Sequence, residues 1–169
     1  MQKILTISYW AILLFYLLLL TYTVFIGRDS IRSVNLIPFD SIKNFIMVDN
    51  GIGGTRIIDM NIWGNILMFI PAGIYLILQH TTKSIAKNLF YIFLFSLFIE
   101  VVQYVFTIGA TDVDDVILNV AGGFMGLMIY KIAEKIFKND MNIKKAISIL
   151  SLIVGLPIFV LVTILFIAN

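Results

Sequence analysis

Long apolar runs separated by short polar stretches dominate the pattern of this chain. An α-helix needs about 20 mainly apolar residues to cross the hydrocarbon core of a bilayer. Five runs meet that requirement, and they cover residues 4–26, about 61–78, about 89–108, about 116–132 and about 147–168. The first run is longer than the apolar part of a secretory signal, so we expect it to be a retained span. The pattern predicts an all-α, polytopic transmembrane helix bundle.

The connection between the first two predicted spans carries a different pattern. Apolar residues recur at Phe39, Ile42, Phe45 and Ile46, with polar residues between them. This spacing is typical of a helix that lies in the headgroup plane with its apolar face towards the acyl chains. We therefore expect a short interfacial amphipathic helix over residues 39–48, before a glycine-containing segment breaks it.

Composition agrees with a membrane location. The chain is 60% hydrophobic and 13% charged, whereas soluble domains are nearer half apolar and a quarter charged. Its mean hydropathy is +1.01. The absence of cysteine and the single histidine exclude disulfides, zinc–thiolate centres and multi-histidine metal sites. The net charge of +2 is small and the basic residues form no single patch, so we expect no nucleic-acid partner.

Lysine and arginine residues divide unequally between the two sides of the five predicted spans. Eight fall on the side of the N-terminus, namely Lys3, Lys83, Lys87, Lys131, Lys135, Lys138, Lys144 and Lys145. Four fall on the other side, namely Arg28, Arg32, Lys43 and Arg56. Because loops rich in Lys and Arg tend to remain in the cytoplasm, this distribution predicts the N-terminus inside and the C-terminus outside.

Two polar residues lie in the middle of the third predicted span. Glu100 and Gln103 are three residues apart, and therefore share one helical face. A charge near the bilayer centre costs at least about 2.5 kcal/mol, so such residues usually face other helices or a polar cavity. One interpretation is that Glu100 is protonated or holds a neighbouring helix. The other is that it belongs to a functional site.

An acidic run follows the same span, with Asp112, Asp114 and Asp115 close together and no positive charge among them. On a helix that begins near Thr111, Asp112 and Asp115 share one face with Asn119. Capping is one explanation, because Thr111-x-x-Asp114 resembles a capping box and helix N-termini favour acidic residues. One aspartate suffices for capping, however, and three repel one another unless a cation or a cationic partner relieves the repulsion. The excess favours a binding site.

Amides and small residues continue this polar character into two spans. Asn61 and Asn65 are one helical turn apart at the start of the second predicted span. Gly122-x-x-x-Gly126 in the fourth span is a small-xxx-small motif, which permits close approach of a second helix. As an isolated pattern, the glycine pair predicts packing.

The predicted topology brings the polar residues of three spans to one side. The residues in the outer half of the membrane are Asn61, Asn65, Gln103, Asp112, Asp114, Asp115 and Asn119, with Glu100 near the middle. The arginines just above them are Arg28, Arg32 and Arg56. We therefore expect a polar pocket that opens towards the outer leaflet, acidic below and basic at its rim.

Four short motifs, in order and in register, resemble those of the VanZ-like family. They are Arg32-x-x-Asn35-Leu36-Ile37-Pro38-Phe39, Asn65-Ile66-Leu67-x-Phe69-Ile70-Pro71-x-Gly73, Ser96-x-x-x-Glu100-x-x-Gln103 and Asp112-x-Asp114-Asp115-x-x-x-Asn119-x-x-Gly122-Gly123-x-x-Gly126. The resemblance covers residues 28–130, and implies a single family domain over residues 1–169 with an extra C-terminal span at about 147–168.

The resemblance implies a protein of the cytoplasmic membrane of a Gram-positive bacterium. Its family's namesake is associated with teicoplanin resistance. The motifs and the expected pocket together indicate a set of ligand-binding residues. They are Arg32, Asn35, Asn65, Glu100, Gln103, Asp112, Asp114, Asp115 and Asn119. The expected partners are membrane lipid and either a lipoglycopeptide antibiotic or a lipid-linked cell-wall precursor.

Two classes of function remain open from the sequence. The first is a resistance factor that lowers susceptibility to lipoglycopeptides by binding the drug, its lipid-linked target or envelope lipid. The alternative is a membrane hydrolase or transferase acting on a lipid-linked phosphate or sugar, with Glu100, Asp112 and Asp115 as catalytic candidates. The same three carboxylates are the candidate ligands of a divalent cation. A transporter is disfavoured, because no internal repeat is evident.

Overall fold

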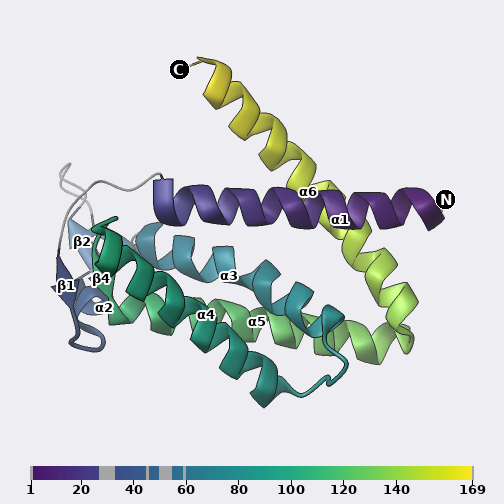
Figure 1. Cartoon of the computed structure of the whole chain (residues 1–169), viewed down its shortest axis with the longest axis horizontal. Coiled ribbons are helices and arrows are strands. Elements are labelled where there is room, and N and C mark those ends of the chain that lie inside the picture. The colour runs from purple at the N-terminus through teal and green to yellow at the C-terminus, as the bar shows by residue number, and fades with distance from the viewer. Residues whose placement is uncertain (1, 27–32, 45, 50–54, 59, 169) are drawn as a thin grey trace. The chain divides into compact units, whose positions relative to one another are not determined.

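A computed structural model of the chain describes residues 2–26, 33–44, 46–49, 55–58 and 60–168 (Figure 1). Long helices account for most of the described residues. They are α1 (Gln2–Thr21), which continues into a short π-helix η1 (Tyr22–Ile26), α3 (Met60–Gln79), α4 (Ile85–Phe106), α5 (Val113–Phe137) and α6 (Asp140–Ala168). Five helices in this part of the chain are long and apolar enough to cross a membrane. The predicted all-α class with about five spans is confirmed.

Helix ends differ from the apolar limits most clearly between the last two spans. The hydropathy pattern left residues 133–146 outside both spans, yet α5 continues to Phe137 and α6 begins at Asp140. Lys138 takes a left-handed conformation with φ of 51°, which ends α5. The side-chain oxygen of Asn139 then accepts a hydrogen bond from the Met141 N–H at 2.8 Å and caps α6. Hydropathy marks where lipid contact ends, whereas caps decide where a helix ends.

The chain divides into two compact units, of which one comprises residues 1–21 and 130–169. Within this unit α1 packs against α6. The rings of Phe15 and Phe159 meet edge to face with centroids 5.1 Å apart. The Tyr130 hydroxyl lies 3.1 Å from a carboxylate oxygen of Asp140, to which it donates a hydrogen bond across the α5–α6 turn. The last part of α5 is therefore tied to the start of α6.

The second unit comprises residues 22–129 and contains α3, α4 and the larger part of α5. Here α5 lies against α3 at its glycines. A Cβ atom added to Gly122 would overlap the Ile66 carbonyl, and one added to Gly126 would overlap the Ile70 carbonyl. The helices can approach this closely only because glycine has no side chain. The glycine pair therefore packs two helices together, as the sequence indicated, and its partner is α3.

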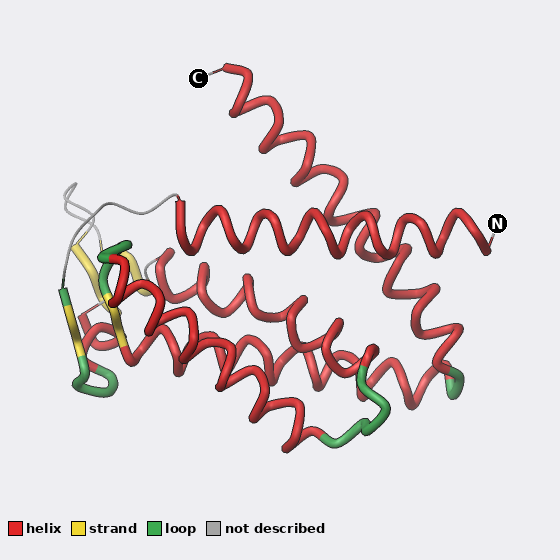
Figure 2. Tube along the Cα trace, viewed as in Figure 1, coloured by secondary structure: helices red, strands yellow, loops and turns green. Residues whose placement is uncertain are grey.

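Short segments gather beside the C-terminal end of α4 in the second unit (Figure 2). They are β1 (Val34–Asn35), α2 (Asp40–Asn44), β2 (Ile46–Asp49), β3 (Thr55–Ile58) and β4 (Thr111–Asp112). β2 pairs antiparallel with β3, and β1 pairs parallel with β4 in the register Val34↔Thr111 and Asn35↔Asp112. The β1–β4 pairing joins the first long connection to the acidic run.

The predicted interfacial helix over residues 39–48 is present only as the five residues of α2. The prediction was too long, because residues 46–49 form a strand that pairs with residues 55–58. β-branched residues lie on both sides of the glycine-containing segment, and such residues favour paired strands over a helix. Phe45, one of the apolar positions that supported the longer helix, lies outside the described residues.

Candidate functional site

The buried face of α4 carries most of the polar residues of that helix. Ser96, Glu100 and Gln103 follow one another at intervals of four and three residues and are all buried, with Glu100 4% and Gln103 0% exposed. The opposite side of α4 presents Val101 and Val105, which are 51% and 62% exposed. In a membrane-spanning helix this arrangement places the apolar side towards lipid and the polar side towards neighbouring helices.

Glu100 fixes the point at which the chain returns to α4. Thr107, with φ of 58°, and Gly109, with φ of 84°, turn the chain back after α4 ends. The Asp112 N–H then donates a hydrogen bond of 2.9 Å to the Glu100 carboxylate. Glu100 therefore lies beneath β4, immediately before α5 begins.

Asp112 caps α5 and joins it to the first long connection. Its Oδ1 accepts a hydrogen bond from the Asp114 N–H at 2.9 Å, which makes Asp112 the N-cap residue instead of Thr111. The same oxygen accepts one from Asn35 Nδ2 at 3.2 Å, and its Oδ2 accepts one from the Ser41 hydroxyl. The prediction that Asp112 shares a helical face with residues 115 and 119 is wrong, because Asp112 belongs to β4 and precedes the helix.

Asp114 caps a different helix from the one that contains it. Its Oδ1 accepts a hydrogen bond from the Phe39 N–H at 2.5 Å, and its Oδ2 accepts one from the Ile42 N–H at 3.1 Å. These donors belong to the N-terminal turn of α2, where unpaired N–H groups and the helix dipole favour an anion. The carboxylate is 1% exposed. A helix of five residues is too short to persist alone, so this contact anchors α2.

The remaining polar candidates form pairs between helices. Asn65 in α3 donates a hydrogen bond of 2.5 Å to Asp115 in α5. Asn119 in α5 donates one of 2.9 Å to the Ser96 hydroxyl in α4. Gln103 donates one of 3.0 Å to the Val24 carbonyl in η1. Each bond satisfies a polar group that would otherwise be costly within a membrane.

Three buried oxygens near these pairs have no hydrogen-bond partner within the described part of the chain. They are Oε1 of Gln103, Oδ1 of Asn119 and Oγ1 of Thr111. Buried acceptors without a donor are uncommon, since nearly all such groups bind protein or ordered water. The interior between α4 and α5 therefore has unused capacity to accept hydrogen bonds.

The structure brings some of the sequence candidates together and separates others. Asn35, Glu100, Asp112 and Asp114 are linked by direct hydrogen bonds, and Ser41 joins them although no sequence pattern distinguished it. The pairs Asn65–Asp115 and Asn119–Ser96 are separate interactions. The side chains of the three predicted rim arginines, Arg28, Arg32 and Arg56, lie outside the described part of the chain.

A groove of about 380 Å³ opens beside the linked residues. Its polar lining residues are Glu100, Thr111 and Asp112. Its apolar lining residues are Val34, Leu36, Leu97, Val101, Tyr104, Val113 and Val116. Leu36 is 71% exposed, and Leu97, Val101 and Tyr104 are also exposed along α4. The groove is therefore amphipathic, with acidic groups on one side and an apolar wall continuous with the outer surface of α4.

The candidate metal ligands do not converge within the described residues. No group of three histidine, aspartate or glutamate side chains there is placed to hold a metal ion. Glu100 accepts a backbone N–H beneath β4, whereas Asp115 bonds to Asn65 on α3. Asp112 bonds to Asn35 and the α5 backbone. The carboxylates act mainly as acceptors for protein donors.

These features define a small multi-pass membrane protein with an amphipathic acidic groove at the junction of its helices and its first long connection. Residues 4–134 match the family model described as VanZ/LLP1, and this range contains every sequence-predicted ligand-binding residue. The chain is also 34% identical over 131 residues to Protein VanZ of Enterococcus faecium, which covers 77% of this chain and 69% of that protein. The chain belongs to the VanZ/LLP1 family. No solved structure matches it.

Proposed function

We propose that this membrane protein lowers susceptibility to lipoglycopeptide antibiotics such as teicoplanin. In this proposal the groove lined by Glu100 and Asp112 binds an amphiphile, which is the drug, its lipid-linked target or an envelope lipid. Membership of the VanZ/LLP1 family and the similarity to Protein VanZ of Enterococcus faecium support the biological role. The lining of the groove supports the mode of binding.

The observation that carries the proposal is the juxtaposition of carboxylates and an exposed apolar wall. An acyl chain would lie along Leu97, Val101 and Tyr104, whose side chains are exposed on α4. An ammonium, hydroxyl or amide group on the same molecule would then reach Glu100 and Asp112. The carboxyl oxygens of both residues can accept hydrogen bonds from such groups, and low-dielectric surroundings strengthen hydrogen bonds.

The proposed topology directs this groove to the outer leaflet. Lysines are concentrated around the end of α5 and the start of α6, at residues 131–145. Because α5 is one helix that is long and apolar enough to cross a membrane, its two ends would emerge on opposite sides. The positive-inside rule assigns the lysine-rich end to the cytoplasm. The start of α5, beside the groove, then faces the side from which a glycopeptide arrives.

The enzymatic alternative has less support from the described residues. A carboxylate-held metal would need its ligands to converge, and Glu100, Asp112 and Asp115 bind different protein groups. The groove offers acceptors and an apolar wall, which suit recognition. Binding of an amphiphile is accordingly the function that we propose.

The test is the susceptibility of a teicoplanin-sensitive Gram-positive host that expresses the chain. We expect the wild type to raise the inhibitory concentration of teicoplanin, and Glu100→Gln to remove that protection at equal membrane abundance on a blot. Glu134→Gln is the matched control, because it makes the same change at a residue that pairs with Lys131 and is not part of the groove lining. Vancomycin serves as the less lipophilic comparison.

Three outcomes would contradict the proposal. The first is an absence of protection by a well-expressed wild type, which would overturn the resistance role. The second is full protection by Glu100→Gln, which would overturn the groove as the site of action. Equal loss of protection in Glu100→Gln and Glu134→Gln would also count against the groove, because the effect would not depend on position.

A further inference from the structure

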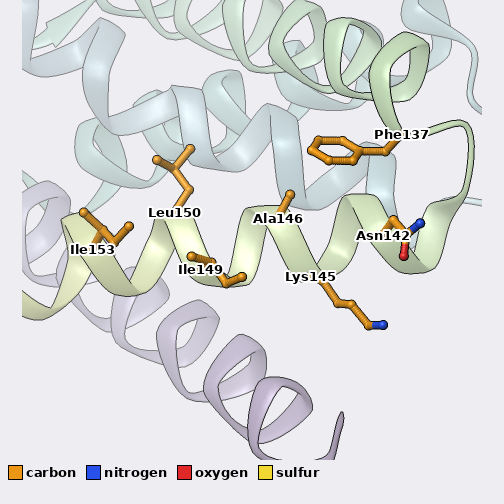
Figure 3. Close-up of a pocket in the computed structure, with 7 residues that line it drawn as sticks. All are labelled: Phe137, Asn142, Lys145, Ala146, Ile149, Leu150 and Ile153. Atoms are coloured by element: carbon orange, nitrogen blue, oxygen red, sulfur yellow. The ribbon is translucent and has the colours of Figure 1, made fainter. Parts of the chain in front are cut away.

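A second groove, of about 590 Å³, lies along the first half of α6, next to the end of α5. Figure 3 shows the Phe137 ring above Ala146 and the Lys145 side chain extending from the opposite side of α6. Asn142 lies at the N-terminal end of this groove, and Ile149, Leu150 and Ile153 continue it along the helix (Figure 3). The groove is therefore polar at one end and apolar along its length.

The length and polarity of this groove match the headgroup of a phospholipid and the adjoining part of its acyl chain. Residues 145 and 153 are eight positions apart, which corresponds to about 12 Å along a helix. Ile149 and Ile153 are one turn apart, so they present a continuous apolar strip next to the polar end. An acyl chain can lie along that strip while a headgroup stays beside Lys145 and Asn142.

The surrounding charge favours an anionic headgroup. Residues 131–145 contain five lysines and two acidic residues, Glu134 and Asp140, which gives this segment a net charge of +3. Glu134 is engaged by Lys131 at 2.7 Å, and Asp140 accepts a hydrogen bond from Tyr130. Among the described residues, Lys145 has no acidic partner within ion-pair distance. Its ammonium is thus available to a phosphate.

We infer that this α6 groove is a binding site for an anionic phospholipid. Lys145 and the Asn142 amide donate hydrogen bonds to the phosphate, and the acyl chain packs on Ile149, Leu150 and Ile153. Clusters of lysine at a membrane surface attract anionic lipid. The groove adds an apolar surface on which the acyl chain of that lipid can pack. The inference is independent of the antibiotic-related groove, which is lined by other residues.

The experiment measures lipid binding to the full-length chain purified in detergent. Native mass spectrometry follows titration with phosphatidylglycerol and, separately, with phosphatidylcholine carrying the same acyl chains. We expect phosphatidylglycerol to bind more tightly. Lys145→Gln should weaken its binding by about fivefold, and should weaken phosphatidylcholine binding less, because the choline group already offsets the phosphate charge. Lys87→Gln is the matched control, because it removes an exposed lysine near the start of α4 and outside the groove.

A second variant tests the apolar strip. Leu150→Ala should weaken both lipids alike, because it removes acyl-chain contact without altering the charge. Equal affinity of the wild type for the two lipids would overturn the inference, since the groove would then hold ordinary surrounding lipid. Unchanged binding of phosphatidylglycerol by a Lys145→Gln variant that remains monodisperse and helical would overturn it as well. Dimers that exclude phosphatidylglycerol would also overturn it, by showing that a second copy of the chain fills the groove.

Discussion

The carboxylate of Asp114 accepts a hydrogen bond of 2.5 Å from the backbone N–H of Phe39, across 75 residues of sequence. A second bond of 3.1 Å, from the Ile42 N–H, makes this carboxylate the cap of α2. α2 precedes the strands β2 and β3, and β1 pairs with β4 beside the groove. One buried acid therefore fixes the segment that borders the candidate site.

The first prediction concerns this cap. Asp114→Ala removes both acceptors of two part-buried backbone N–H groups, at a cost of about 1–3 kcal/mol in total. We expect amide exchange at Phe39 and Ile42 to accelerate by at least about tenfold, measured by hydrogen–deuterium exchange and mass spectrometry. Asp140→Ala, at the start of α6, should leave exchange in residues 39–44 unchanged. Unaltered exchange in Asp114→Ala would show that α2 does not depend on this carboxylate.

The second prediction concerns the contact between α3 and α5. A methyl group on Gly122 would overlap the Ile66 carbonyl, so Gly122→Ala must force the helices apart. Overpacking of this kind costs about 2 kcal/mol, and we expect the Tm in detergent to fall by about 5 °C. Gly64→Ala is the matched control, because its Cβ would meet no atom within 4 Å. A Gly122→Ala protein as stable as Gly64→Ala would contradict the close approach.

The third prediction separates the groove wall from the rest of the lipid-facing surface of α4. Val101→Ser exchanges an apolar lining residue for a polar one and should weaken acyl-chain contact by about 1 kcal/mol, or about fivefold in affinity. We expect protection from teicoplanin to fall correspondingly in the susceptibility assay. Val105→Ser, one turn further along α4 and outside the groove lining, should protect as the wild type does. Equal behaviour of the two variants would count against acyl-chain contact at Val101.

The fourth prediction concerns orientation in the membrane. The chain has no cysteine, so single cysteines can be introduced without first removing any native ones. Lys43→Cys and Lys138→Cys place thiols at exposed positions on the two opposite sides of the proposed topology. A membrane-impermeant maleimide added to intact cells should label Lys43→Cys, and should label Lys138→Cys only after the cells are opened. The reverse labelling pattern would show that the topology is the opposite of the one proposed and that the candidate groove faces the cytoplasm.

Much of the architecture could be predicted from local pattern. The five spans follow from hydropathy, because a bilayer permits only helices, of about 20 residues, in a chain of this kind. The burial of Glu100 and Gln103 follows from the same cost of exposing polar groups to lipid. Gly122 and Gly126 indicated close packing, although the sequence did not name α3 as the partner.

Local pattern was less informative where partners lie far apart in the sequence. From the sequence alone, the excess of aspartates favours a site for a cation or a cationic partner that relieves their repulsion. In the structure Asp112 caps α5, Asp114 caps α2 and Asp115 bonds to Asn65. Periodicity identifies which residues share a helical face, and it contains no information on where another segment supplies a donor. The shortened α2 has the same origin, since the β2–β3 pairing competes with helix extension.

The sequence by itself determined the number of spans, their approximate limits, the family and the polar residues that must be buried. These properties depend on the composition of contiguous segments and on the cost of placing polar groups in lipid. Only the tertiary structure decided which donor each carboxylate receives and where Glu100, Asp112 and the exposed wall of α4 form a groove. A groove and a hydrogen bond both require residues from different segments to lie close together. The fold of the whole chain determines which segments do so.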